Sequence, residues 1–128
     1  MELEVKQQDN ILVARVTGEF FLEEAIEGFR QLLETVQHHD ATKVIIDGLD
    51  ISGKITNLES YEYGISIAEE LHKLIVSKNY KFPHFAYVLK PTFYNKNDLI
   101  GETVAANLGA QVKVFENMNE AIEWLRDN

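Results

Sequence analysis

The sequence predicts one α/β domain over residues 1–128, with a mixed, mostly parallel sheet of about five strands. Segments with apolar residues spaced three and four apart alternate with short β-branched runs, a pattern typical of helices that alternate with strands. The 128 residues are 45% hydrophobic, enough for one core without disulfides. The predicted order is β-β-α-β-α-β-α-β-α, in which right-handed crossovers make the sheet parallel and the first strand of the hairpin runs antiparallel.

The first half of the chain predicts a hairpin, a long helix and a central strand. Apolar and polar residues alternate in residues 3–15 around Asp9-Asn10, which tolerate a tight turn. Apolar residues in 21–36 recur with the period of an amphipathic helix. Residues 43–47, KVIID, form a run typical of a parallel strand that is buried on both faces.

The second half predicts a helix that begins with a capping box. Residues 56–59, TNLE, place a threonine three residues before a glutamate, so a helix is expected from about Asn57 to Ser77. A strand, a helix capped by Asn97 or Asp98 and closed by Gly109, a further strand and a last helix follow, over residues 84–89, 97–109, 111–115 and 119–126.

Four loops are expected to share the edge of the sheet where the parallel strands end, which is where open α/β sheets place their sites. These loops are residues 17–21, 48–56, 90–97 and 116–119. They bring together a candidate site for a partner or a ligand, consisting of Phe20, Phe21, Asp47, Asp50, Phe93 and Tyr94. A second apolar stripe, on the helix after Thr56, contains Tyr63, Ile67 and Leu74. Plain core packing is the alternative interpretation of these side chains.

Composition excludes several classes of function. The net charge of −9 repels nucleic acid and anionic lipid, and no apolar run approaches the roughly 20 residues that cross a bilayer. The absence of cysteine excludes disulfides, thiolate metal sites and cysteine nucleophiles, and with the polar amino-terminal residues it predicts a cytoplasmic protein. No cofactor is expected.

Residues 48–54, GLDISGK, fit the glycine and lysine positions of a phosphate-binding loop. The next residue is Ile55, where such a loop needs serine or threonine for magnesium, and Asp50 would repel the phosphates. The helix also begins too late for its amino terminus to reach a phosphate. The match is therefore interpreted as a coincidence.

No set of residues predicts catalysis or a metal site. Asp47 and Asp50 are interpreted as a strand end and a turn in preference to an acid–base pair. None of the four histidines has a partner at the i, i+4 spacing of a helical zinc site, and His38-His39 lie where they are expected to cap a helix end. An enzyme that acts through Asp47, Asp50 and Ser52 is the less favoured alternative.

Three stretches carry a resemblance to a known family: TGEFFLEEAIEGF, KVIIDGLDISG and the segment from HFAYVL to VFENMNEAIEWL. Over its whole length the chain resembles the STAS-like (SpoIIAA-like) superfamily, in its uncharacterised bacterial branch related to Sec14-type domains. The resemblance implies a small mixed sheet covered by helices and a role in regulation, protein interaction or ligand sensing. In the phosphorylated antagonists of this superfamily a serine follows Asp-x, as Ser52 does in Asp50-Ile51-Ser52-Gly53, so Ser52 is a candidate phosphosite.

The sequence thus favours a non-enzymatic regulatory module that binds a protein partner, in one arrangement another copy of itself as a homodimer. A carrier of a small apolar ligand or lipid is the alternative, suggested by the Sec14-type relation and by the aromatic residues of the loops.

Overall fold

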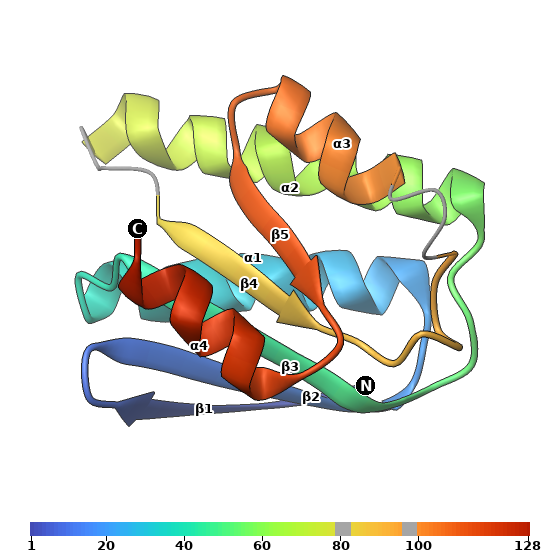
Figure 1. Ribbon diagram of the computed structural model, residues 1–128. Helices are drawn as coiled ribbons and strands as arrows, with labels where there is room; N and C mark the ends of the chain where they lie inside the picture. Colours follow the sequence, from blue (N-terminus) through green and yellow to red (C-terminus); the bar gives the residue numbers. More distant parts are fainter. Residues whose placement is uncertain (79–82, 96–99) are drawn as a thin grey trace.

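A five-stranded sheet with the strand order β1-β2-β3-β4-β5 forms the centre of the molecule (Figure 1). The computed structural model describes residues 1–78, 83–95 and 100–128. β1 pairs antiparallel with β2, and every other pair is parallel. The elements are β1 (Glu2–Gln8), β2 (Ile11–Glu19), α1 (Leu22–His38), β3 (Lys43–Ser52), α2 (Asn57–Lys78), β4 (His84–Val88), α3 (Ile100–Asn107), β5 (Gln111–Phe115) and α4 (Met118–Arg126). The predicted order and the mixed, mostly parallel sheet are confirmed.

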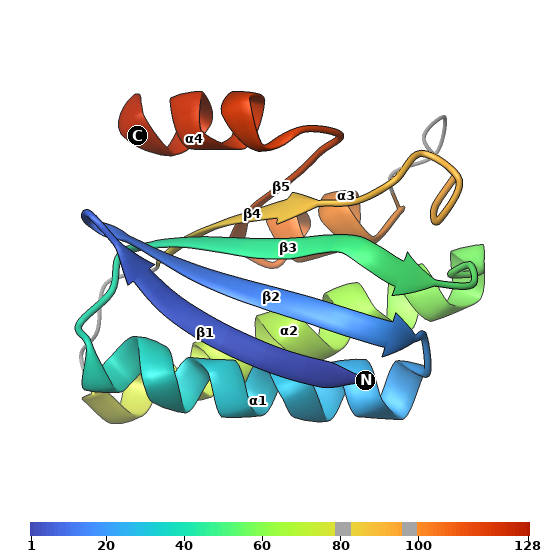
Figure 2. The same ribbon diagram turned by 90° about the horizontal axis from the view of Figure 1, so that it is seen from below.

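Helices cover the two faces of the sheet unequally. Figure 2 shows α1 and α2 side by side on one face and α4 alone on the other. Right-handed crossovers that all step in the same direction place their helices on one face, and α3 packs against α2 on that face. None of the helices in the described ranges is long and apolar enough to span a membrane.

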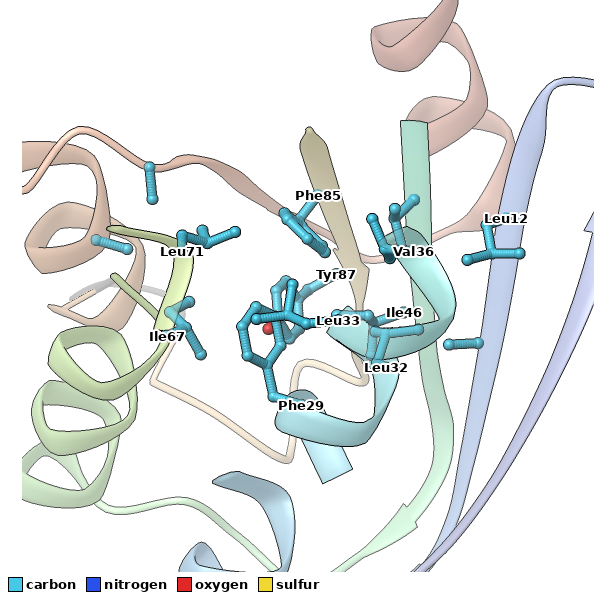
Figure 3. Packing of buried hydrophobic residues seen from close by; sticks show 14 of the residues in the cluster. Leu12, Phe29, Leu32, Leu33, Val36, Ile46, Ile67, Leu71, Phe85 and Tyr87 are labelled. Carbon is cyan, nitrogen blue, oxygen red and sulfur yellow. The ribbon is translucent and has the colours of Figure 1, made fainter. Parts of the chain in front are cut away.

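Two buried clusters lie on the two faces. Alternate side chains of β3 supply both, because successive residues of a strand point to opposite sides: Val44 and Ile46 face α1 and α2, and Ile45 faces α4. Figure 3 shows the larger cluster, in which side chains of α1 and α2 meet over β4, among them Phe29, Leu32, Leu33, Ile67, Leu71, Phe85 and Tyr87. The smaller cluster joins Ile45, Ala86 and Val88 to Ala121 and Leu125 of α4.

The local signals in the sequence are present in the structure. Asp9 adopts a φ of 54° in the hairpin turn, and Gly109 closes α3 with a φ of 94°. The capping box forms both of its hydrogen bonds: the amide of Thr56 donates to Glu59 Oε1 at 3.0 Å, and the amide of Glu59 donates to Thr56 Oγ1 at 3.1 Å. The predicted caps of α3, Asn97 and Asp98, lie outside the described residues.

Three predicted boundaries are wrong. The expected loop over residues 17–21 is strand as far as Glu19, because β2 extends to that residue. The expected loop over residues 48–56 is largely strand, because β3 continues to Ser52. A register shift between Arg15 and Thr17 realigns the ladder, so that residues 17–19 of β2 pair with 50–52 of β3. The last helix begins at Met118 and not Asn119, since the side chain of Asn117 caps it by accepting from the amide of Glu120 at 2.9 Å.

Helices α2 and α3 are in backbone contact through two glycines. A Cβ atom built on Gly64 would lie 2.6 Å from the carbonyl oxygen of Gly101, and one on Gly101 would lie 2.7 Å from Ser60 Oγ. Ser60 Oγ also accepts a hydrogen bond from the amide of Gly101 at 3.0 Å. This contact fixes α3 beside α2 and sets one wall of the cavity described next.

Candidate functional site

A cavity of about 370 Å³ lies between the sheet and helices α1 and α2. Residues of every strand and of α1, α2 and α3 line it, most of them apolar. Exposed residues such as Glu24 and Asn57 also line the cavity, so it opens to solvent at one end. Its volume is in the range of known small-molecule sites.

Loops at the carboxyl ends of the parallel strands surround the opening of the cavity at one end of the sheet. We call this edge, residues 20–21, 53–56, 89–95 and 116–117, the rim. The amide of Phe20 donates to the carbonyl of Ser52 at 3.0 Å, and the amide of Ile55 donates to the carbonyl of Phe93 at 2.8 Å. These bonds tie the loops after β2, β3 and β4 to one another.

Aromatic rings form much of the wall. Phe20 and Phe93 meet edge to face with centroids 5.2 Å apart, and Tyr63 lies in the same relation to Phe29 at 6.5 Å and to Tyr87 at 6.0 Å. Edge-to-face pairs are a favourable arrangement of aromatic quadrupoles, so these ring contacts contribute to the stability of the wall. The wall offers a ligand an apolar surface.

Two tyrosine hydroxyls are the polar groups deepest in this wall. The hydroxyls of Tyr63 and Tyr87 lie 2.8 Å apart and share a hydrogen bond. Burial raises the pKa of Tyr63 to about 12, and burial also raises the pKa of Tyr87 well above its usual value. Both hydroxyls therefore stay protonated at neutral pH and can donate.

Carboxylates dominate the polar part of the lining. Glu2, Glu24, Glu27 and Glu102 belong to it, and the described lining contains no lysine, arginine or histidine side chain. The α-ammonium of Met1, also in the lining, pairs with Glu24 Oε1 at 2.6 Å. Glu27 pairs with Arg30 at 3.2 Å.

Glu102, on α3, adds a further carboxylate to the wall of the cavity. Its Oε2 accepts from the amide of Val114 at 2.7 Å, which ties α3 to β5. Burial, followed by the charges of Glu116 and Glu102, raises the pKa of Tyr94. The lining near Tyr94 is therefore negative.

The six residues of the predicted loop site separate into two groups. Phe20, Phe93 and Tyr94 line the cavity, while Phe21 is 51% exposed beside it. Asp47 and Asp50 lie on the opposite face of the sheet, because they alternate with the cavity-lining residues Ile46 and Ile51 of β3.

The two aspartates have structural partners there. Asp47 Oδ1 accepts from the amide of Leu49 at 3.2 Å, and Asp50 forms an exposed ion pair with Arg15. Ser52 is exposed at the end of β3, on the strand whose Ile51 points to the cavity. The structure therefore does not gather these three residues around a common cleft.

Residues 48–52 are extended and belong to β3, so they form no curved loop around a phosphate. His39 caps α1 as its position predicts, with Nδ1 2.9 Å from the carbonyl oxygen of Thr35. His72 Nε2 lies 2.7 Å from the carbonyl oxygen of Leu108 and joins α2 to the end of α3. In the ranges that the structure describes, no three acidic or histidine residues converge as metal ligands.

Sequence reasoning missed Tyr87 and the four glutamates. Tyr87 is the fourth residue of an apolar run, HFAYVL, in which nothing distinguishes it from a core residue. The glutamates are spread over β1, α1 and α3, and only the folded chain brings them to one cavity. The tyrosine in this largely apolar strand was the one available signal, since a buried hydroxyl needs a partner.

Comparison with known proteins identifies the fold family. The crystal structure of an anti-sigma factor antagonist from Mycobacterium paratuberculosis matches with a TM-score of 0.59 and 17% sequence identity, covering 98% of this chain and 94% of that one. No curated protein sequence shows a significant match. A family model described as SpoIIAA-like matches residues 11–126. The chain therefore belongs to the SpoIIAA-like family, whereas the relation to Sec14-type domains stays a prediction.

Proposed function

We propose that the protein is a non-enzymatic, cytoplasmic regulatory module that binds a protein partner at the rim. Membership of the SpoIIAA-like family supports this proposal most. The structural neighbour is described as an anti-sigma factor antagonist, so an anti-sigma factor is the first class of partner to test. A second copy of the chain is the other partner under this proposal.

Exposed apolar side chains mark the proposed docking surface. Leu58 is 66% exposed and Tyr61 47% exposed at the amino-terminal end of α2, and Phe21 precedes α1 at the same end of the sheet. Large apolar side chains that remain in solvent are typical of surfaces that bind partners. A partner that contacts Phe21, Leu58 and Tyr61 would also cover the opening of the cavity at the rim.

The test measures binding to purified anti-sigma factors from the same genome. Leu58→Asp is expected to weaken the complex by roughly 30-fold or more, as loss of a central apolar contact does. Leu108→Asp is the matched control, because Leu108 is also exposed but lies at the far end of α3. The proposed surface is wrong if both variants bind equally, and the proposed partner class is wrong if no anti-sigma factor binds.

The homodimer is tested by sedimentation of the isolated protein. A concentration-dependent dimer that Leu58→Asp dissociates, and Leu108→Asp does not, would support self-association through the same surface. A monomer at high concentration would exclude this arrangement.

Ser52, the last residue of β3, is proposed as a site of phosphorylation next to the rim. Ser52 is exposed, and α2 begins five positions later, at Asn57. A phosphate on Ser52 would therefore lie in solvent and not at the amino terminus of the helix. Phosphate would add about two negative charges beside the proposed docking surface and weaken an acidic partner's binding. Intact-mass measurement of the protein from its own cells tests this, with Ser52→Ala as the control that must lack the added mass.

The cavity favours a second candidate function, the binding of a small apolar ligand. Its aromatic wall and its volume suit such a ligand, and it opens near the rim, where an occupant would be sensed by a partner. Extraction of the purified protein with organic solvent followed by mass spectrometry tests for a bound compound. A stoichiometric compound is expected, and its absence together with failure to bind any added apolar probe would refute this function.

A further inference from the structure

The chemical groups of the cavity restrict what kind of ligand fits, and this inference rests on the second function proposed above. The first restriction is size. At about 30 Å³ for the volume of one water molecule, 370 Å³ holds roughly a dozen non-hydrogen atoms. A single chain of medium length or a compact ring system fits inside the cavity.

The second restriction is charge. Four glutamates line the cavity, and of their carboxylates only those of Glu24 and Glu27 pair with a cation in the described part of the chain. A ligand carboxylate or phosphate would lose its hydration and meet like charges, with no described lysine or arginine in the lining to replace the water. Apart from the Met1 ammonium, which already pairs with Glu24, the described lining has no cation, so it favours a neutral head group over an anionic one.

The third restriction comes from the two tyrosines. Two neutral hydroxyls carry two O–H donors, and the bond between Tyr63 and Tyr87 uses one of them. Within the described residues neither hydroxyl makes a second hydrogen bond. Either tyrosine can be the donor in that bond, and both line the cavity, so the remaining O–H can donate to an acceptor that enters the cavity.

The fourth observation is a glycine that gives the cavity room. Gly28 lies inside α1, where glycine costs about 1 kcal/mol relative to alanine. A Cβ built on Gly28 would meet no atom within 4 Å, so close packing does not require glycine there. Gly28 lines the cavity, and any larger side chain would project toward the space a ligand uses.

We infer that the cavity binds a neutral, mainly apolar molecule of about a dozen non-hydrogen atoms, in which an acceptor oxygen of a carbonyl, ester or ether receives a hydrogen bond from the Tyr63–Tyr87 pair. The aromatic wall holds the apolar body. The glutamates disfavour fatty acids and phospholipids of the same chain length.

The test compares two isomeric probes on the full chain by NMR titration of backbone amides. Methyl nonanoate has a neutral ester, and decanoate has a carboxylate on a chain of nearly equal length. The ester is expected to bind at least about tenfold more tightly, with shifts at the cavity residues. Equal or tighter binding of decanoate would overturn the inference about the head group but leave the carrier function standing.

Two variants locate the binding. Gly28→Leu fills the cavity and is expected to abolish binding of the ester while the protein stays folded by circular dichroism. Asp50→Asn, on the opposite face, is the control that must bind as the unmodified protein does. Unchanged binding to a folded Gly28→Leu protein would place the ligand elsewhere and refute the inference.

The tyrosine pair is tested by the double replacement Tyr63→Phe with Tyr87→Phe, which leaves no unpaired hydroxyl. Ester binding is expected to weaken about 2- to 10-fold, and binding of naphthalene, which has no acceptor oxygen, to stay unchanged. Equal effects on both probes would show that the tyrosines only shape the wall. If neither the ester nor naphthalene binds the unmodified protein, both this inference and the carrier function fail, while the proposed protein interaction is untouched.

Discussion

Gly28 lies inside α1 and Gly64 inside α2, and the same substitution, glycine to alanine, can be made at both. The added Cβ has open space at Gly28 and meets backbone atoms at Gly64. In an open helical position this change stabilises by about 1 kcal/mol, because alanine loses less backbone entropy on folding. Gly28 is such a position, since nothing lies within 4 Å of the added Cβ. Gly28→Ala is therefore expected to raise the free energy of unfolding by about 1 kcal/mol.

Gly64→Ala is expected to do the reverse. The new Cβ would lie 2.6 Å from the carbonyl oxygen of Gly101, whereas ordinary contact begins near 3.4 Å, so the two backbones must separate by about 0.8 Å. Overpacking of this kind costs about 1–3 kcal/mol, and a backbone neighbour cannot turn aside as a side chain does. After the gain in helix propensity of about 1 kcal/mol is subtracted, a net loss of about 1 kcal/mol remains.

The assay is urea unfolding followed by circular dichroism, with thermal unfolding as a second measurement. The free energies of unfolding of the two variants should differ by about 2 kcal/mol, or on the order of 10 °C in Tm for a domain of this size. Equal stability of the two variants would refute the close contact between α2 and α3. A changed denaturant slope would instead mean that the unfolded or native ensemble had changed.

Three further predictions concern other parts of the fold. Thr56→Ala removes the capping hydroxyl of α2 and should cost about 1 kcal/mol in urea unfolding, whereas Thr56→Ser should cost little; equal losses would rule out the cap. The raised pKa of Tyr63 means that its contribution to the free energy of unfolding is complete below pH 10 and is lost as the pH rises toward about 12. Absorbance of the Tyr63 and Tyr87 phenolates should therefore appear only with unfolding, and titration of these hydroxyls in the folded protein near pH 10 would contradict their burial. Tyr63→Phe should make the free energy of unfolding depend less steeply on pH in this range. Burial, and after it the charge of Lys43, lowers the pKa of His84. The contribution of neutral His84 to the free energy of unfolding is therefore present above pH 6.5 and is lost as the pH falls below that value. An NMR titration of His84 with a midpoint at or above 6.5 would be inconsistent with this packing.

Local signals in the sequence predicted the elements well where a short-range hydrogen bond or dihedral angle decides them. The capping box at Thr56 and the closing glycine at Gly109 are examples, since each depends on residues within one helical turn. The end of β3 was mispredicted because Gly48 and Asp50 favour a loop locally. A register shift in β2, which lies far away in the sequence, extends the ladder to Ser52.

The candidate site was predictable only in part, for a related reason. Phe20, Phe93 and Tyr94 follow strands, and the topology rule placed them at one edge, where they do line the cavity. The cavity itself depends on the spacing of α1 and α2 and on the contact between Gly64 and Gly101. No periodicity encodes such distances between helices.

The strand order has a consequence for how the chain folds during synthesis. Each strand pairs with the one made just before it, so the sheet grows at one edge and no strand must be inserted between two that are already paired. The loops to be closed are accordingly short for a parallel sheet, which favours rapid folding. Until β5 and α4 emerge from the ribosome, the backbone of β4 is an open edge, and this interval is when the nascent protein is most exposed to aggregation.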